Sequence, residues 1–204
     1  MSADQGSSSS SHPASAQPGS AGASAGTQTI VLGGGCFWCT EAVYVRVRGV
    51  LDVESGYANG PGARPSYEQV CTGRTGYVEV VRLTFDPAVI SLREILEIFF
   101  VVHDPHTLNR QGNDVGTQYR SGIYTVDDAQ AATAREVIAE IAAQDGPGAP
   151  PVVTEVEPLG NYYPAEAYHQ DYFEQHPGQG YCAMVVAPKV EKFRKTFARL
   201  SKDA

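Results

Sequence analysis

The sequence has no long apolar run. No stretch approaches the roughly 18 consecutive apolar residues of a membrane span. Positive charge is also scarce, with 15 Lys and Arg against 23 Asp and Glu, so the net charge is -8. An acidic chain argues against nucleic acid or a membrane surface as the main partner. A local basic run at residues 189–195 is interpreted as the solvated face of a C-terminal helix.

Cysteine is scarce as well. The chain has four, Cys36, Cys39, Cys71 and Cys182. Four are too few for a disulfide scaffold, and a Cys-x-x-Cys pair with isolated cysteines is typical of redox chemistry or of a metal site in a cytosolic protein. A structural zinc site needs a second pair at similar spacing, which is missing, so we predict no metal. Cys71 is expected to be a buried, structural thiol.

Residues 1–26 are rich in Ser, Ala, Gly and Pro and hold one charged residue, Asp4. Such a segment cannot bury enough apolar surface to fold, so we predict a disordered tail. It has neither the basic start nor the apolar core of a signal peptide, and we expect a cytoplasmic protein. Residues 27–204 are predicted to form one globular domain.

Strands and helices alternate after the tail. Strands are predicted at 28–33, 50–57, 76–85, 119–126, up to 156 and at 184–187. Helices are predicted at 36–46, 92–102, 128–143, 165–173 and from Pro188 onward. This order favours an α+β, two-layer sandwich with a central mixed sheet, a ferredoxin-like core and a loop-rich C-terminal segment. The long loop at 103–118 has the length typical of functional loops.

The run from Gly33 to Cys39 is the clearest chemical signal. An apolar strand ends in three glycines, and Cys36 follows where a helix should begin. A helix N-terminus favours a thiolate, so Cys36 is predicted to be a reactive nucleophile. Cys39 lies one helical turn later and could resolve an oxidised Cys36, or could be half of a zinc site. The alternative for Cys36 is a small buried residue at a strand–helix junction.

Glu79 lies among apolar neighbours in a predicted strand. Burial there would raise the pKa of its carboxyl group and suit it to be a general acid. A solvent-facing position on an alternating strand is an equally good interpretation. Tyr67 and Tyr119 lie near loop–strand boundaries, where a phenol can point into a cleft.

Several long segments resemble the A-type peptide methionine sulfoxide reductases in sequence order. They are Gly35-Cys36-Phe37-Trp38, Gly56-Tyr57-Ala58, the segments 67–73 and 75–81, His103-Asp104-Pro105, the segment 110–121 and Tyr168-His169-Gln170-Asp171-Tyr172. The resemblance covers residues 27–195. It implies an enzyme that reduces the S-epimer of methionine sulfoxide, free or in proteins, as a repair of oxidative damage.

The resemblance also implies roles for individual residues. Cys36 would be the nucleophile and Glu79 the acid that protonates the sulfoxide oxygen. Tyr67, Tyr119 and Asp114 would belong to the pocket around that oxygen, and Phe37 with Trp38 would form the apolar niche for the methyl group. An aromatic wall opposite hydrogen-bond donors can distinguish the two substituents of a chiral sulfur.

Turnover needs a second thiol to reduce the Cys36 sulfenic acid. By resemblance Cys182 is the resolving cysteine, whereas Cys39 replaces the glycine that often follows the tryptophan. The first disulfide could join Cys36 to either residue, and a relay from Cys39 to Cys182 is a third route. The resemblance implies thioredoxin as the reductant, dithiothreitol as its substitute in vitro, no bound cofactor and a monomer. A disulfide oxidoreductase using Cys36 and Cys39, and a binding module without turnover, are the alternatives.

Overall fold

The computed structural model of the protein describes residue 1 and residues 26–202. The predicted disordered tail therefore lies, apart from residues 1 and 26, outside the described residues. Within the described part of the chain, no helix is both long and apolar enough to cross a membrane.

A six-stranded sheet forms the centre of the fold. Across the sheet lie β7 (Glu155–Pro158), β6 (Ser121–Thr125), β1 (Gln28–Gly34), β3 (Val78–Phe85), β2 (Val50–Ala58) and β8 (Tyr162–Pro164). All neighbours are antiparallel except β6 and β7, which makes the sheet mixed. The order of the four middle strands is that of a ferredoxin-like core, and the predicted α+β fold is confirmed.

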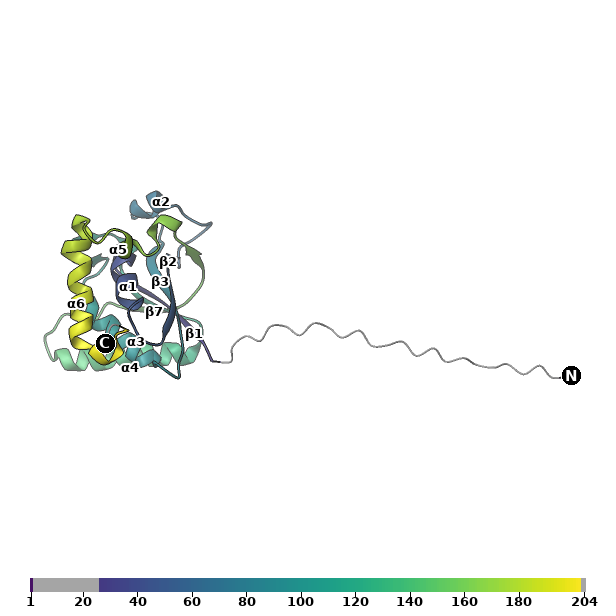
Figure 1. The fold of residues 1–204 in the computed structure, drawn as a ribbon. Coiled ribbons are helices and arrows are strands. Elements are labelled where there is room, and N and C mark those ends of the chain that lie inside the picture. Colours follow the sequence, from purple (N-terminus) through teal and green to yellow (C-terminus); the bar gives the residue numbers. More distant parts are fainter. Residues whose placement is uncertain (2–25, 203–204) are drawn as a thin grey trace.

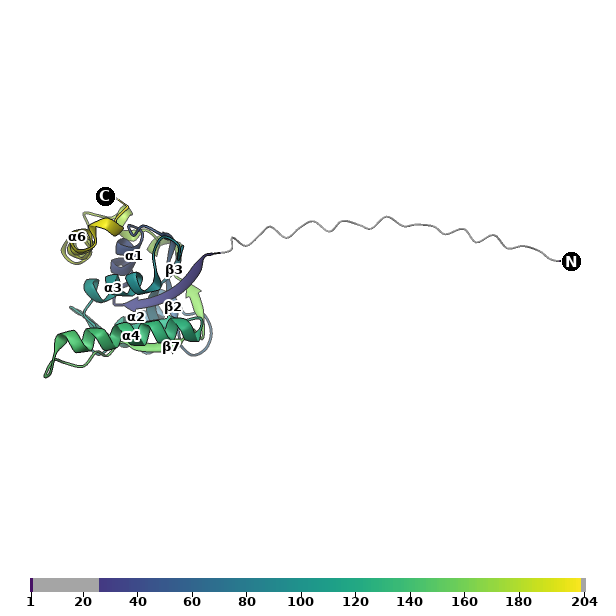
Figure 2. The same ribbon diagram turned by 90° about the horizontal axis from the view of Figure 1, so that it is seen from below.

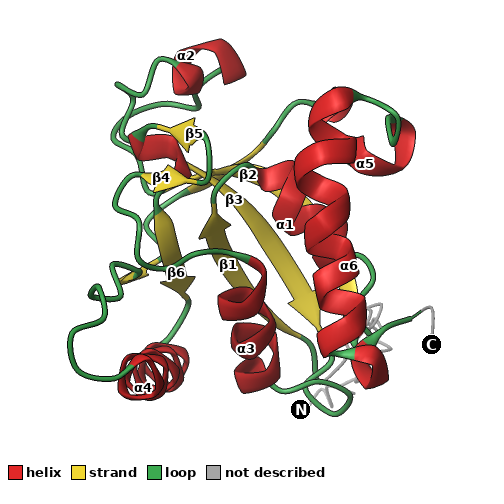
Figure 3. Ribbon diagram, turned by 90° about the vertical axis from the view of Figure 1, so that its left-hand side faces the viewer, coloured by secondary structure: helices red, strands yellow, loops and turns green. Residues whose placement is uncertain are grey.

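Four helices lie on one face of the sheet, the last of them packed on the outside of the first two (Figures 1 and 3). They are α1 (Phe37–Tyr44), α3 (Leu92–Val102), α4 (Asp128–Asp145) and α6 (Ala187–Thr196). Helix α1 packs on β1, β2 and β3, while α4 runs alongside β6 and β7 (Figure 2). Alternate strand residues such as Ile30, Leu32, Val81 and Leu83 face these helices and are fully buried. Burial of this shared apolar face holds the two layers together.

Short elements complete the fold around the sheet. They are α2 (Tyr67–Cys71), β4 (Arg110–Gln111), β5 (Asp114–Val115), α5 (Tyr172–Gln175), and single 3₁₀ turns at Thr117–Tyr119, Ala167–His169 and Ala198–Leu200. Helix α2 begins with a reciprocal capping box between Ser66 and Gln69, which stabilises so short a helix. Neither α2 nor β8 was predicted from the sequence.

The predicted strand at 184–187 is wrong. Residues Cys182–Val186 form a π-helical turn that continues directly into α6. The buried side chains of this stretch, Cys182, Val186, Val190 and Phe193, recur at helical spacing. That period outweighs the strand preference of the two adjacent valines.

The predicted helix at 165–173 is also wrong. Gln170 has extended backbone angles and Asp171 is left-handed, with φ of 53°, so the helix breaks between them. The Gln170 amide instead accepts a hydrogen bond from the Ser55 N–H and donates one to the Ser55 carbonyl oxygen. These long-range bonds of the Gln170 side chain hold the chain in the conformation that interrupts the predicted helix.

Candidate active site

The glycine turn places Cys36 at the end of the central strand. Strand β1 runs through Gly34, and Cys36 is the residue immediately before α1. Gly35 has φ of 93°, a conformation that favours glycine, and a Cβ there would lie 2.6 Å from the Gln111 side chain. Only glycine therefore allows the chain to turn here. Cys36 is 8% exposed and is therefore buried.

Glu79 is buried beside this turn. It lies on β3, directly opposite Tyr57 on β2, and is 1% exposed. The backbone N–H of Phe37 donates a hydrogen bond to its Oε2 at 3.2 Å. Burial nevertheless raises the pKa of the Glu79 carboxyl group to about 8, and the Asp114 carboxylate adds to the shift. The solvent-facing alternative for Glu79 is excluded, and the group is mostly protonated at neutral pH.

The surroundings of Cys36 act on its thiol in two ways. Burial raises the pKa of its thiol well above the usual value, with Cys39 and Glu79 adding to the rise. The prediction of a resting thiolate assumed that the helix N-terminus would stabilise the sulfur. The first free N–H of α1, that of Phe37, is instead donated to Glu79. Burial therefore opposes ionisation of the Cys36 thiol in the unliganded protein.

Cys39 is the more acidic of the two neighbouring thiols. Its interaction with Cys36 lowers its pKa to about 7 against the effect of burial, helped by the positive charge of Lys189. The Tyr181 hydroxyl group lies 3.7 Å from its sulfur and donates a hydrogen bond to Asp114 Oδ2 at 2.6 Å. A thiolate at Cys39 is thus available near neutral pH.

The other two cysteines lie on opposite sides of this pair. Cys182 is fully buried at the start of the π-helical turn, where burial and then the charge of Cys39 raise its pKa. Cys71 ends α2 and is exposed, so the prediction that it is buried is wrong. Helix α2 stands at the edge of the site, and its buried residue is Val70, the position before Cys71.

Aromatic rings line the site beside Cys36. Phe37 is 1% exposed and lies behind the site, 5.0 Å from the His169 ring and 5.8 Å from Tyr57 between ring centroids. Trp38 is half-buried, and Tyr172 stacks on its indole ring at 3.8 Å with an interplanar angle of 6°. The Trp38 Nε1–H donates a hydrogen bond to His169 Nδ1 at 3.1 Å.

The two predicted phenols lie near the acid. Burial raises the pKa of Tyr119, and the charges of Glu79, Cys36 and Asp114 raise it further. Burial, Cys71 and Glu79 likewise raise the pKa of Tyr67. Both tyrosines therefore keep their protons and can donate hydrogen bonds at physiological pH.

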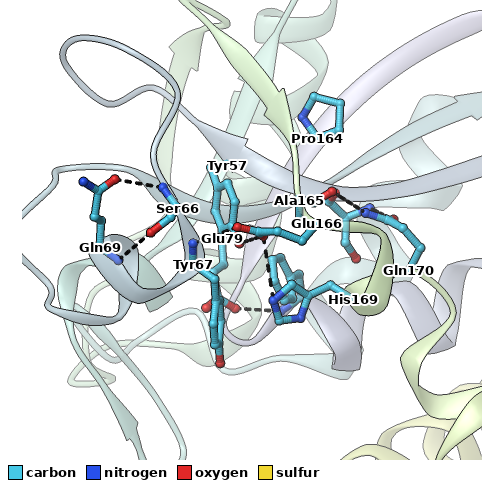
Figure 4. Close-up of polar contacts among 12 residues, drawn as sticks. Tyr57, Ser66, Tyr67, Gln69, Glu79, Pro164, Ala165, Glu166, His169 and Gln170 are labelled. Atoms are coloured by element: carbon cyan, nitrogen blue, oxygen red, sulfur yellow. Dashed lines mark hydrogen bonds and ion pairs between the residues drawn. The ribbon is translucent and has the colours of Figure 1, made fainter.

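Five further residues complete the site. Tyr57, Glu166 and His169 are shown in Figure 4, and Tyr172 and Tyr181 contact the Trp38 ring. For Tyr57, His169 and Tyr172 there was a signal, since they lie in the segments Gly56-Tyr57-Ala58 and 168–172 that carried the resemblance. Glu166 and Tyr181 had no comparable signal. We call residues 165–186 the C-terminal segment, because it supplies most of the residues that the sequence did not identify. Among the described residues, no group of three or more His, Cys, Asp and Glu side chains could hold a metal ion.

Comparison with known proteins assigns the family. The family model described as peptide methionine sulfoxide reductase matches residues 28–201. The "Peptide methionine sulfoxide reductase MsrA" of Polynucleobacter asymbioticus is 61% identical over 170 residues, which are 83% of this chain and 88% of that protein.

Solved structures agree. Reduced Mxr1 from Saccharomyces cerevisiae aligns with a TM-score of 0.71 at 38% identity, over 80% of this chain and 92% of that one. The same yeast protein in complex with Trx2 aligns with a TM-score of 0.50 at 29% identity, over 73% of this chain and 86% of that one. The chain therefore belongs to the peptide methionine sulfoxide reductase family and is a thiol-dependent oxidoreductase.

Proposed function

We propose that the chain reduces the S-epimer of methionine sulfoxide, free or within proteins, with Cys36 as nucleophile and Glu79 as acid. One observation carries the proposal: a fully buried carboxyl group, with a pKa of about 8, is hydrogen-bonded to the N-terminus of the helix that follows Cys36. A sulfoxide oxygen leaves only after it is protonated, and an acid that keeps its proton at neutral pH can supply that proton.

The first step transfers oxygen from substrate to enzyme. The Cys36 sulfur attacks the sulfoxide sulfur as Glu79 protonates the oxygen, and the Cys36 proton passes to the neighbouring Cys39 thiolate. The oxygen then moves to Cys36 as a sulfenic acid while methionine leaves as the thioether, so sulfur in the substrate is reduced and Cys36 is oxidised. The Cys39 thiolate is a fitting acceptor because its pKa is about 7.

Binding before this step uses two opposed walls. Tyr67 and Tyr119 donate hydrogen bonds to the sulfoxide oxygen, and the Asp114 charge helps to keep Glu79 protonated. Phe37 and Trp38 form the methyl niche; Trp38 is the more accessible of the two rings. The opposed walls select one epimer because exchanging methyl and oxygen would place an unpaired oxygen against aromatic rings.

Recycling proceeds as a relay. The Cys39 thiol attacks the Cys36 sulfenic acid, forms the Cys36–Cys39 disulfide and releases water. Cys182 then attacks Cys39, which frees Cys36 as a thiol and leaves a Cys39–Cys182 disulfide. Two observations support this order: Cys36 and Cys39 interact directly, and Cys39 is the thiol whose charge affects Cys182.

Thioredoxin is the proposed final reductant, since a yeast structure of the same fold is a complex with Trx2. Its dithiol would reduce the Cys39–Cys182 disulfide, and dithiothreitol would replace it in vitro. The proposal includes a single catalytic domain at residues 27–204, a monomer without bound cofactor, and a cytoplasmic location.

The roles of Cys36 and Glu79 are tested by turnover of methionine-S-sulfoxide with dithiothreitol. Cys36→Ser is expected to abolish turnover, because serine cannot form a sulfenic acid. Cys182→Ser should keep a first turnover that yields one equivalent of methionine. Turnover by Cys36→Ser at the rate of the unmodified protein would refute the assignment.

The relay is tested by mapping disulfides by mass spectrometry after one equivalent of substrate. Cys182→Ser is expected to accumulate the Cys36–Cys39 disulfide, and the unmodified protein the Cys39–Cys182 disulfide. In Cys39→Ser, the sulfenic acid of Cys36 should persist. A Cys36–Cys182 disulfide formed at full rate in Cys39→Ser would show that Cys182 resolves Cys36 directly.

A further inference from the structure

Glu166 is a carboxylate that the proposed reaction does not use, yet it joins three elements around the site (Figure 4). Its Oε2 accepts a hydrogen bond from the Tyr57 hydroxyl group at 2.7 Å, and its Oε1 accepts one from the Tyr67 backbone N–H at 2.9 Å. The same carboxylate faces His169 Nε2 at 3.9 Å. The Glu166 carboxylate, in the C-terminal segment, therefore contacts both strand β2 and the start of α2.

His169 connects this charge to Trp38. The histidine is 1% exposed, and its Nδ1 accepts the hydrogen bond from the Trp38 indole. Because an indole N–H can only donate, Nδ1 carries no proton and the ring's proton is on Nε2. Among the described residues Nε2 has no hydrogen-bond partner, and the Glu166 carboxylate lies 3.9 Å from it, beyond hydrogen-bond distance but close enough for its charge to act. A nearby negative charge favours this tautomer.

The indole ring of Trp38 is thus held in two ways. Tyr172 covers one face by stacking, and His169 fixes the edge that carries the N–H. Rotation of the ring about its side-chain bonds would break the hydrogen bond and lose the stacking. The ring is therefore pre-oriented before substrate arrives, which is how a binding wall contributes most to affinity.

We propose that Glu166 and His169 are positioning residues for Trp38: the Glu166 carboxylate selects the Nε2–H form of His169, and that form fixes the indole ring. The inference rests on the proposed contact between Trp38 and the methyl group of the sulfoxide. Through Tyr67, the same carboxylate also sets the wall that binds the oxygen. The Glu166 carboxylate then fixes the spacing between the methyl wall at Trp38 and the oxygen-binding wall at Tyr67, and hence the preference for one epimer.

The indole N–H resonance of Trp38 gives a direct test, because Trp38 is the only tryptophan in the chain. In ¹H–¹⁵N spectra, His169→Leu should shift this single indole signal, whereas His169→Asn, whose side-chain oxygen can accept the same bond, should keep it. In steady-state assays, His169→Leu should raise KM for the S-epimer about fivefold, the loss expected for one hydrogen bond. The preference for the S- over the R-epimer should fall with it, and His169→Asn should restore both.

Glu166→Gln keeps an acceptor oxygen and removes the charge. We expect a partial shift of the indole signal and a KM raised about twofold. The variant also carries the test if His169→Leu does not fold. The matched control is Glu54→Gln, because Glu54 likewise accepts a tyrosine hydroxyl bond, from Tyr162 at 2.8 Å, away from Trp38. It should move neither the indole signal nor KM.

The outcomes separate this inference from the proposed function. If Trp38→Phe leaves KM unchanged, the methyl wall is wrong and the positioning role falls with it. If Trp38→Phe raises KM while His169→Leu or Glu166→Gln leaves both KM and the indole signal unchanged, the positioning role alone is refuted. A shifted signal with a raised KM, reversed in His169→Asn, supports it.

Discussion

The two sides of the site are built differently. On the sheet side, which comprises residues 33–39 and Glu79, neighbouring strands in fixed register hold the reacting groups. On the other, the C-terminal segment consists of a 3₁₀ turn, a four-residue helix and a π-helical turn, joined to the site largely by side chains. A backbone ladder resists single substitutions, whereas side-chain hydrogen bonds contribute roughly 1 kcal/mol each. Chemistry therefore depends on the sheet side, and orientation and recycling depend on the C-terminal segment.

The largest effect should follow from removing the acid on the sheet side. Glu79→Gln is expected to lower kcat about 100- to 1,000-fold, because an amide cannot protonate the sulfoxide oxygen. In the unmodified protein, activity should fall as the pH rises through about 8, where Glu79 loses its proton. This alkaline limb should vanish from the kcat profile of Glu79→Gln.

Glu79→Asp is the matched comparison. It keeps an acid on a shorter side chain, so a smaller loss with the alkaline limb retained is expected. A limb that persisted unchanged in Glu79→Gln would assign the proton to another group.

The second prediction contrasts two glycines, one on each side. Gly35→Ala places a methyl group 2.6 Å from Gln111 at φ of 93° and should cost about 2–4 kcal/mol of unfolding free energy. Gly180→Ala, in the C-terminal segment, meets no atom within 4 Å and has no positive φ, so its effect should stay within about 0.5 kcal/mol. Urea unfolding measures both. Equal losses would contradict the contrast between a rigid turn and a tolerant segment.

The same contrast explains what the sequence could predict. The sheet side was accessible because its signals are local: apolar strands, a glycine turn and a cysteine before a helix. The helix break at Gln170 depends on hydrogen bonds to Ser55, and the contacts of Glu166 are with Tyr57 and Tyr67. These partners lie about 100 residues away in the sequence, so no local pattern contains them. The hydrogen bond from the Phe37 N–H to Glu79 could not be predicted for a similar reason, because Glu79 lies on a distant strand.

The third prediction concerns Glu41, which contacts both the sheet and the C-terminal segment. Glu41, in α1, is 2% exposed and accepts hydrogen bonds from the Ser55 hydroxyl group and the Tyr172 N–H. Burial raises the pKa of Glu41 to about 7, above its value in the unfolded chain. The folded state then binds the additional proton, so this group's contribution to stability is greatest at low pH and is lost as the pH rises toward 7.

Glu41→Gln should therefore remove the pH-dependent free-energy cost of ionising a buried carboxyl group. The unfolding free energy of the unmodified protein, relative to the variant, should fall by about 1–2 kcal/mol between pH 5 and pH 8. Denaturant unfolding at the two pH values measures the difference, in which the contribution of Glu79 cancels. A constant difference would mean that Glu41 is fully ionised throughout and that its hydrogen bonds outweigh burial.

The smallest effect is expected at Tyr181, whose hydroxyl group helps to lower the pKa of Cys39. In Tyr181→Phe this pKa should rise above about 7, so the thiolate fraction at neutral pH should fall about twofold. Formation of the Cys36–Cys39 disulfide, followed by quenched-flow mass spectrometry in the Cys182→Ser background, should slow by that factor at pH 7. At pH 9 both proteins hold mostly thiolate at Cys39 and the rates should converge. A constant ratio across this range would mean that Tyr181 acts by positioning the C-terminal segment through Asp114, and not through the acidity of Cys39.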